Sequence, residues 1–325
     1  MLIVGSFALG WILFDLQGYM RSPLVAIEQP VHYTVEPGAS LIGVANDLKR
    51  RGIIDHPSYL VWYARWEGGA DHIKAGDYIL QPGMTPARLL EQLVSGEVVQ
   101  YTLTIPEGWT FRQLIAALDR HDKIKHELRG YNDDAIMVML GLPGQHPEGL
   151  FYPDTYKFSE GTSDIVLLKQ AYEAMTTRLE SEWRQRAPGL PYDTPYEALI
   201  MASIIEKETA LPEERERIAG VFVRRLQKNM RLQTDPTVIY GMGERFDGNI
   251  RRRDLKAPTP YNTYLIKGLP PTPIALPGGA SIHAALHPAS GDELYFVSRG
   301  DGSHQFSATF DEHNAAVRKY QLKRY

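Results

Sequence analysis

The sequence contains no cysteine among its 325 residues. This absence excludes disulfide bonds, thiolate metal sites and a cysteine nucleophile, and it is compatible with an oxidising compartment. An excess of positive charge is also lacking, since 35 Lys and Arg residues face 39 Asp and Glu residues, for a formal net charge of −4. Without a basic field to attract phosphate groups, nucleic acid is not an expected partner.

Long apolar runs are absent except at the amino terminus, where MLIVGSFALGWILF precedes the first charge at Asp15. A membrane-spanning helix needs about 20 apolar residues. No Lys or Arg precedes the run and no Ala-x-Ala-like cleavage site follows it, so the run is neither a complete anchor nor a complete signal peptide. A cleaved signal and a core helix are the alternatives to an anchor. We favour an anchor helix over residues 1–20 with a truncated start, which would place the rest of the chain outside the membrane. Residues 21–30, with two prolines, predict a linker.

The length exceeds one ordinary hydrophobic core and predicts two domains of the α+β class. Residues 32–48, 77–93 and 100–118 each combine a β-prone stretch, a Pro-Gly or Glu-Gly turn and an amphipathic helix. Ser40, Thr85 and Thr110 stand at the expected N-caps of the three helices. We therefore predict a small domain over residues 31–120 and a larger one over residues 121–325.

The first of these segments, YTVEPGASLIGVANDL, resembles a LysM module. The resemblance implies a strand–helix–helix–strand fold that binds glycans containing N-acetylglucosamine. The alternative is a small domain whose strand–turn–helix units serve packing alone.

The most informative segment of the larger domain is a helix that begins at the capping box of Thr194 and Glu197. It is almost wholly apolar from Ala198 to Ile205, so most of its circumference must be buried. Glu206 follows this apolar stretch, where loss of hydration favours a protonated carboxyl group that can donate to a glycosidic oxygen. At 100° per residue, Glu208 points roughly opposite to Glu206, so the two glutamates are not a catalytic dyad. A structural ion pair at the helix end is the alternative for Glu206.

Seven motifs in one order resolve that choice. They are EGLFYPDTYKF from Glu148, ASIIEKET from Ala202, RLQTDPTVIYG from Arg231, PYNTY from Pro260, GLPPTPIALPG from Gly268, HPASGDELYFV from His287 and GSHQFSATFDEHN from Gly302. Together they resemble the YceG-like endolytic murein transglycosylase family over nearly the whole chain.

The resemblance implies a lyase that cuts the bond between N-acetylmuramic acid and N-acetylglucosamine within peptidoglycan strands, without water, and leaves 1,6-anhydro ends. The first Glu of the IIEKE motif, Glu206 here, would be the catalytic acid and base. The resemblance also implies an inner-membrane anchor with the catalytic domain on the periplasmic side, and no cofactor. The substrate would be newly made strands, whose length the cut would limit, and cell-wall synthases are possible partners.

Further residues are predicted to bind the glycan because buried sugar hydroxyl and acetamide groups need polar partners. They lie in the QTDP, PYNTY and YPDTY motifs and are Gln233, Asp235, Tyr261, Asn262, Tyr264, Asp154 and Tyr156. Each of these motifs is also compatible with a purely structural turn or loop.

Two histidines, His283 and His287, have the four-residue spacing that can present imidazoles to zinc. The general-base Glu of the zinc protease motif is missing and the family resemblance implies no metal, so we predict surface or loop-facing histidines here. Two other functions stay open at this stage. One is a hydrolytic muramidase, which would leave reducing ends, and the other is a noncatalytic peptidoglycan-binding scaffold.

Overall fold

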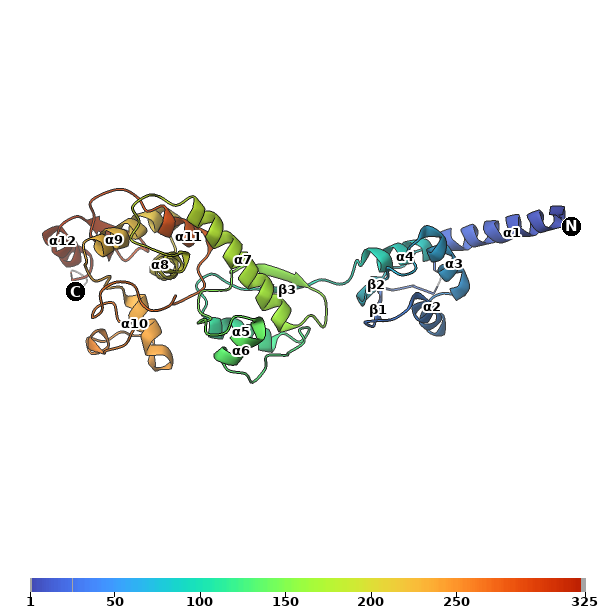
Figure 1. The fold of residues 1–325 in the computed structure, drawn as a ribbon, viewed down its shortest axis with the longest axis horizontal. Coiled ribbons are helices and arrows are strands. Elements are labelled where there is room, and N and C mark those ends of the chain that lie inside the picture. Colours follow the sequence, from blue (N-terminus) through green and yellow to red (C-terminus); the bar gives the residue numbers. More distant parts are fainter. Residues whose placement is uncertain (1, 25, 323–325) are drawn as a thin grey trace. The chain divides into compact units, whose positions relative to one another are not determined.

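The computed structural model describes residues 2–24 and 26–322. The chain forms two compact units (Figure 1). Unit 1 consists of Met1–Thr102 with Lys157–Thr162, and unit 2 of Leu103–Tyr156 with Ser163–Tyr325. Helices and short two-stranded sheets are mixed in the chain, which confirms the α+β class.

Unit 1 contains one two-stranded antiparallel sheet, in which Val31 of β1 lies opposite Leu80 of β2. Its elements are α1 (Leu2–Arg21), β1 (Val31–Val35), α2 (Leu41–Arg50), α3 (Pro57–Glu67), β2 (Gly76–Leu80) and α4 (Pro86–Ser95). The helices cover a core that includes Tyr33, Tyr78 and Leu60. From β1 to β2 the order is strand–helix–helix–strand, which is the order that the LysM resemblance implies; glycan binding by this unit stays a prediction.

The helix α1 packs against α3 and α4 through its carboxyl-terminal half. Leu16 and Met20 are buried there, and the Tyr59 hydroxyl donates to the Asp15 carboxylate at 2.6 Å. In the part of the chain that the structure describes, no helix has the length and apolar character needed to cross a membrane. The anchor over residues 1–20 therefore stays a prediction, and Met1 lies outside the described residues.

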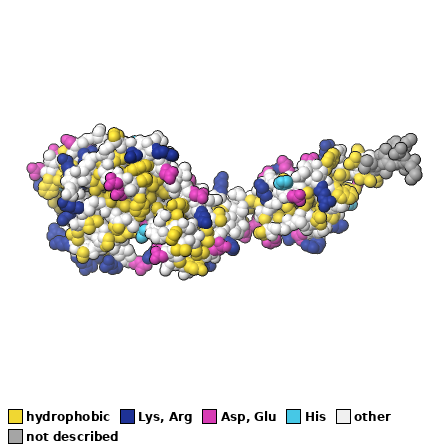
Figure 2. Space-filling view, in the orientation of Figure 1, with side chains coloured by type: hydrophobic (Ala, Val, Ile, Leu, Met, Phe, Trp, Pro, Cys, Tyr) yellow, Lys and Arg dark blue, Asp and Glu magenta, His cyan; other side chains and the backbone are white. Residues whose placement is uncertain are grey.

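Unit 2 is built around α8 (Pro195–Glu208), which contacts α7, α9, α10 and α11. Every residue from Ala198 to Ile205 is buried, as the apolar run predicted. Figure 2 shows hydrophobic side chains gathered over the centre of this unit on the face in view. Its other helices and strands are α5 (Phe111–Arg120), α6 (Asp133–Leu140), α7 (Asp164–Arg184), α9 (Arg215–Gln227), α10 (Asp235–Met242), α11 (Gly279–Leu286), β5 (Tyr295–Ser298), β6 (His304–Ser307) and α12 (Phe310–Tyr320), with short 3-10 turns at Pro212–Glu214, Gly243–Arg245 and Asp254–Lys256.

The boundary between the two units falls within the third strand–turn–helix segment, residues 100–118. Its strand β3 (Tyr101–Thr104) pairs with β4 (Thr155–Phe158), and its helix α5 belongs to unit 2. The reason is packing, because Phe111 of α5 stacks on Phe151 in the core of unit 2. The boundary between the units therefore falls between residues 102 and 103, whereas the sequence pattern predicted a boundary near residue 120. The three predicted N-caps are confirmed, since the side chains of Ser40, Thr85 and Thr110 each accept from a backbone N–H.

Candidate active site

Glu206 occupies the last turn of α8, and the local sequence explains its position. The predicted capping box of Thr194 and Glu197 starts the helix, and both of its hydrogen bonds are present. The apolar stretch then buries the helix, whereas Glu206 itself stays partly exposed. Its Oε2 accepts a hydrogen bond from the backbone N–H of Gly278 at 3.0 Å. A carboxyl group thus stands at the edge of the core, with one oxygen engaged by a fixed backbone donor.

Gly278 is held in place by the proline-rich segment before it. The Ile274 N–H donates to the Ser203 hydroxyl at 3.0 Å, which attaches this segment to the middle of α8. Two further backbone hydrogen bonds join Leu276 to the Pro-Glu-Gly turn: Gly108 N–H to Leu276 O at 2.8 Å and Leu276 N–H to Trp109 O at 2.7 Å. Three segments distant in the sequence therefore converge on Glu206.

A second carboxyl group, that of Glu107, lies in the same place. A Cβ atom added to Gly278 would stand 1.8 Å from Glu107 Oε1, so glycine leaves the space that this carboxyl occupies. Burial, and then the charge of Glu206, raise the pKa of Glu107, whereas Arg215 lowers it. Sequence reasoning missed Glu107, because the Pro-Glu-Gly turn looked like one more strand–turn–helix connection. Its proximity to Glu206 depends on the tertiary contacts of Leu276.

Two cations border this pair of carboxyl groups. Lys207 Nζ donates to the Gly108 carbonyl at 3.1 Å, which ties α8 to the turn that carries Glu107. The Nε of Arg215 is buried and has no hydrogen-bond partner among the described residues. A buried donor without a partner is costly, so it is a candidate to bind an acceptor group of a ligand.

A cavity of about 720 Å³ adjoins this site, and Lys207, Glu148, Tyr240 and Tyr261 are among its lining residues. The volume is in the range of ligand-binding pockets. Glu148 is only 3% exposed, and its carboxyl group accepts from Phe111 N–H at 2.9 Å and from the Tyr240 hydroxyl at 3.0 Å. Burial raises the pKa of Glu148 to about 7 despite these hydrogen bonds. Of the predicted glycan-binding residues, Tyr261 lines this cavity.

A second cavity, of about 480 Å³, is lined by Glu208 together with Gln233, Asp235 and Tyr264. Glu208 contacts the Thr234 hydroxyl, and burial raises the pKa of Glu208 to about 7. Glu206 and Glu208 thus have separate partners and separate surroundings, as their 200° separation on the helix predicted. Asp235 accepts from the Tyr264 hydroxyl at 2.7 Å, and Gln233 has a positive φ of 54°. For a non-glycine residue this backbone conformation is uncommon and is often associated with functional sites.

The other predicted glycan-binding residues lie apart from both cavities. Asn262 is fully buried, and its amide group is occupied within its own loop: the NH₂ group donates to three carbonyls, Ala257 O at 2.8 Å among them, and Oδ1 accepts from Tyr264 N–H. This bonding gives Asn262 a structural role. Asp154 accepts from the neighbouring Thr155 N–H, and the Tyr156 hydroxyl donates to Tyr152 O at 2.7 Å. Neither residue lines the two cavities.

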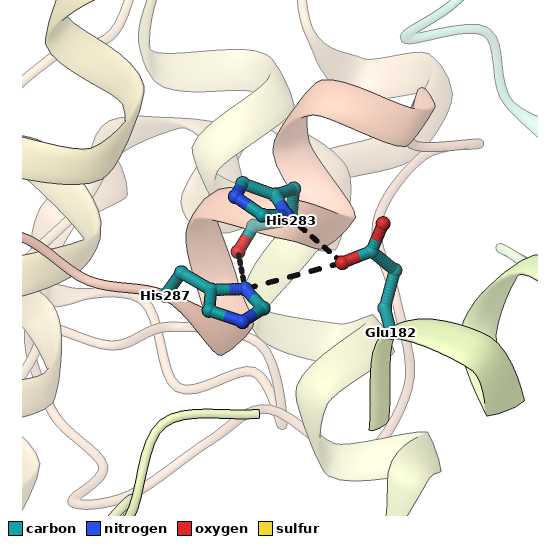
Figure 3. Close-up of side chains that lie close together, drawn as sticks. All are labelled: Glu182, His283 and His287. Atoms are coloured by element: carbon teal, nitrogen blue, oxygen red, sulfur yellow. Dashed lines mark hydrogen bonds and ion pairs between the residues drawn. The ribbon is translucent and has the colours of Figure 1, made fainter. Parts of the chain in front are cut away.

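The two histidines of the SIHAALHP segment have a partner that the sequence did not indicate. Glu182 of α7 lies beside His283 and His287 of α11 and its carboxyl end (Figure 3). The His283 side chain is about half exposed, in line with the predicted surface position. The Glu182 side chain beside it is only 15% exposed. Among the described residues, Glu182, His283 and His287 form a group with the geometry to hold a metal ion.

Comparisons with known proteins agree with the motif pattern. The model of the YceG-like family matches residues 33–319. An endolytic murein transglycosylase of Bacillus subtilis (strain 168) is 33% identical, over 93% of this chain and 89% of the relative. A protein of the same name from Streptococcus pneumoniae serotype 2 (strain D39) is 28% identical, and the match covers 88% of this chain but 57% of that longer protein. The crystal structure of a YceG-like protein from Listeria monocytogenes superposes with a TM-score of 0.56 and 30% identity, over 88% of this chain and 99% of that one.

Proposed function

The chain belongs to the YceG-like family, and we propose that Glu206 is the acid and base with which it cuts murein strands internally. Relatives that are 28% and 33% identical over most of the chain are named endolytic murein transglycosylases, and the chain is an enzyme of this class, a peptidoglycan lyase. One observation supports the choice of Glu206. Its carboxyl group lies in the last turn of α8, accepts from the Gly278 N–H and lies close to the Glu107 carboxyl group.

The proposed reaction uses one carboxyl group twice, first to donate a proton and then to accept one. Glu206 protonates the oxygen that leaves C1 of N-acetylmuramic acid, and the bond from C1 to that oxygen breaks through an oxocarbenium-like transition state. The ionised Glu206 then takes the proton of the muramyl C6 hydroxyl while O6 bonds to C1. The products are a new N-acetylglucosamine end and a 1,6-anhydro-muramyl end, and no water is consumed.

Glu107 is proposed to help supply the proton that Glu206 donates to the leaving oxygen. A carboxyl group close to a negative charge is harder to ionise. The raised pKa of Glu107, caused by burial and by the charge of Glu206, fits a group that keeps its proton beside Glu206. The Gly278 N–H can stabilise the ionised form of Glu206 after the first proton transfer.

The glycan strand is proposed to occupy the cavity of about 720 Å³, where Tyr261 and Glu148 offer polar groups on a largely apolar wall. Gln233, Asp235 and Tyr264 line the separate cavity around Glu208 and remain proposed contacts for more distant sugars. Asp154 and Tyr156 remain proposals from the sequence motif. No step of this reaction requires a cofactor.

The enzyme is proposed to act at the inner membrane, with α1 as its anchor and the LysM-like unit 1 as a glycan-binding module. Trp11, Leu13 and Phe14 of α1 are exposed apolar side chains, which supports membrane contact. The substrate would then be strands newly made by cell-wall synthases, and internal cuts would limit strand length. Association with a synthase is tested by a pull-down from membranes, in which lack of synthase enrichment counts against it.

The reaction is tested by mass spectrometry of purified peptidoglycan strands digested with the detergent-solubilised full chain. Wild type and the Glu216→Gln control, an exposed position on α9, should produce internal 1,6-anhydro-muramyl ends, and Glu206→Gln should produce none. Reducing ends would identify a hydrolase instead. Absence of any cleavage by folded wild-type protein that binds the strands would favour the noncatalytic scaffold, and full activity of Glu206→Gln would refute the residue assignment.

A further inference from the structure

We propose that Glu182, His283 and His287 form a binding site for a divalent transition metal ion, with zinc as the best match. The three residues come from two elements, α7 and the carboxyl-terminal end of α11. The Glu182 carboxylate points toward the two imidazole rings, which stack on each other (Figure 3). His283 Nδ1 lies 2.9 Å and His287 Nδ1 lies 3.9 Å from the same oxygen, Glu182 Oε2. This site is separate from the carboxyl pair of Glu206 and Glu107.

The distances suit a metal ion once the two stacked imidazole rings rotate so that their nitrogens converge. The three ligand atoms all lie within 4.8 Å of one another. Zinc binds imidazole nitrogen and carboxylate oxygen at about 2.0–2.2 Å, so it holds such atoms within about 4 Å of one another. Two imidazoles and one carboxylate are a ligand set that favours zinc and its transition-metal neighbours over magnesium or calcium, which prefer oxygen ligands.

The groups behind the ligands are already oriented for this role. Arg178 contacts the other Glu182 oxygen, Oε1, at 2.9 Å, which leaves Oε2 directed at the histidines. His287 Nε2 lies 2.9 Å from the Gln185 carbonyl oxygen, which can only accept, so Nε2 carries a hydrogen. Metal-binding histidines are commonly fixed in this way, by a hydrogen bond from the other ring nitrogen to a carbonyl.

The second ring nitrogen of His287, Nδ1, faces the His283 carbonyl oxygen at 3.2 Å and Glu182 Oε2 at 3.9 Å. Both neighbours are oxygen acceptors, so this nitrogen lies among electron-rich atoms. A zinc ion would bind Nδ1 of both histidines and the carboxylate together.

The proposed ion would fasten α11 to α7 and is not expected to perform catalysis. The general-base Glu of the zinc protease motif is absent from SIHAALHP. The amino-terminal end of the same helix presents Gly278 to Glu206. Because α11 has eight residues, the two ends lie about 12 Å apart. Metal binding should therefore stabilise the protein against unfolding.

The test is calorimetric titration of the EDTA-treated, dialysed full chain with zinc chloride, together with thermal unfolding with and without the ion. The variants are His283→Ala, whose side chain is 46% exposed, and Glu182→Gln, which keeps the size of the side chain but removes its charge. The matched control is His72→Ala, an exposed histidine of unit 1.

We expect one zinc ion per chain and a higher Tm with zinc for wild type and His72→Ala. Both site variants should bind zinc at least tenfold more weakly and lose the rise in Tm. Magnesium chloride should have no effect on any of them. The proposal is overturned if wild type shows no saturable binding, or if His283→Ala and Glu182→Gln, folded by circular dichroism, bind zinc as tightly as wild type.

Discussion

Gly278→Ala is the substitution that most directly tests the arrangement around Glu206. Gly278 has φ −76° and ψ 169°, values that alanine adopts readily, so the backbone need not change. The added Cβ would, however, lie 1.8 Å from Oε1 and 2.2 Å from Cδ of Glu107. Ordinary contacts are about 3.5 Å or longer, so the Glu107 carboxyl group must move by more than about 1 Å.

The expected effect is large on cleavage and small on stability. A misplacement of about 1 Å in an active site can reduce the rate about 100-fold, which corresponds to about 3 kcal/mol in activation free energy. The free energy of unfolding should change by less than about 1 kcal/mol, because alanine restricts the unfolded chain but is a poorer N-cap than glycine for α11. The control is Gly18→Ala in α1, where an added Cβ has no neighbour within 4 Å.

The assay is the initial rate at which new 1,6-anhydro ends appear in purified strands, measured for Gly278→Ala, Glu107→Ala and the double variant. If the new Cβ acts only by displacing the Glu107 carboxyl group, the double variant should be no slower than Glu107→Ala. A wild-type rate for Gly278→Ala would refute the reasoning. So would a double variant about 100-fold slower than Glu107→Ala, since the Cβ would then act on another part of the site.

Two further predictions concern residues that support the site. Burial raises the pKa of Glu148 from 4.5 to about 7, so its contribution to stability is present below pH 4.5 and is lost as the pH rises through 7. Glu148→Gln should reduce the loss of unfolding free energy between pH 5 and pH 8 by up to about 3 kcal/mol in urea titrations, and an unchanged pH dependence would contradict this. Ser203→Ala leaves the buried Ile274 N–H without its acceptor and should cost about 1–3 kcal/mol in the same assay, with slower glycan cleavage because Gly278 is less firmly held. Wild-type stability and rate for Ser203→Ala would show that the proline-rich segment is held by other contacts.

Much of the local structure follows from the sequence because its causes are local. The N-caps at Ser40, Thr85 and Thr110 and the capping box at Thr194 depend on side chains within three residues of the backbone groups they bind. The apolar stretch of α8 predicted its own burial. The opposite directions of Glu206 and Glu208 follow from helix geometry alone.

The composition of the site could not be predicted in the same way. Gln233, Asp235 and Tyr264 were predicted only as glycan-binding residues, and the sequence did not indicate that they line the cavity around Glu208. The side-chain amide of Asn262 makes its hydrogen bonds within its own loop, and the PYNTY motif did not indicate this.

The family, the helix that carries Glu206 and the choice of that residue as the catalytic candidate could all be predicted before the fold was known, because ordered motifs and helical periodicity are properties of the chain alone. The proximity of Glu107 to Glu206, and of Glu182 to His283 and His287, became visible in the folded protein. In both cases the partners lie about 100 residues apart, and no periodic pattern connects positions at that distance. They meet because buried backbone hydrogen bonds and helix packing bring separate segments together.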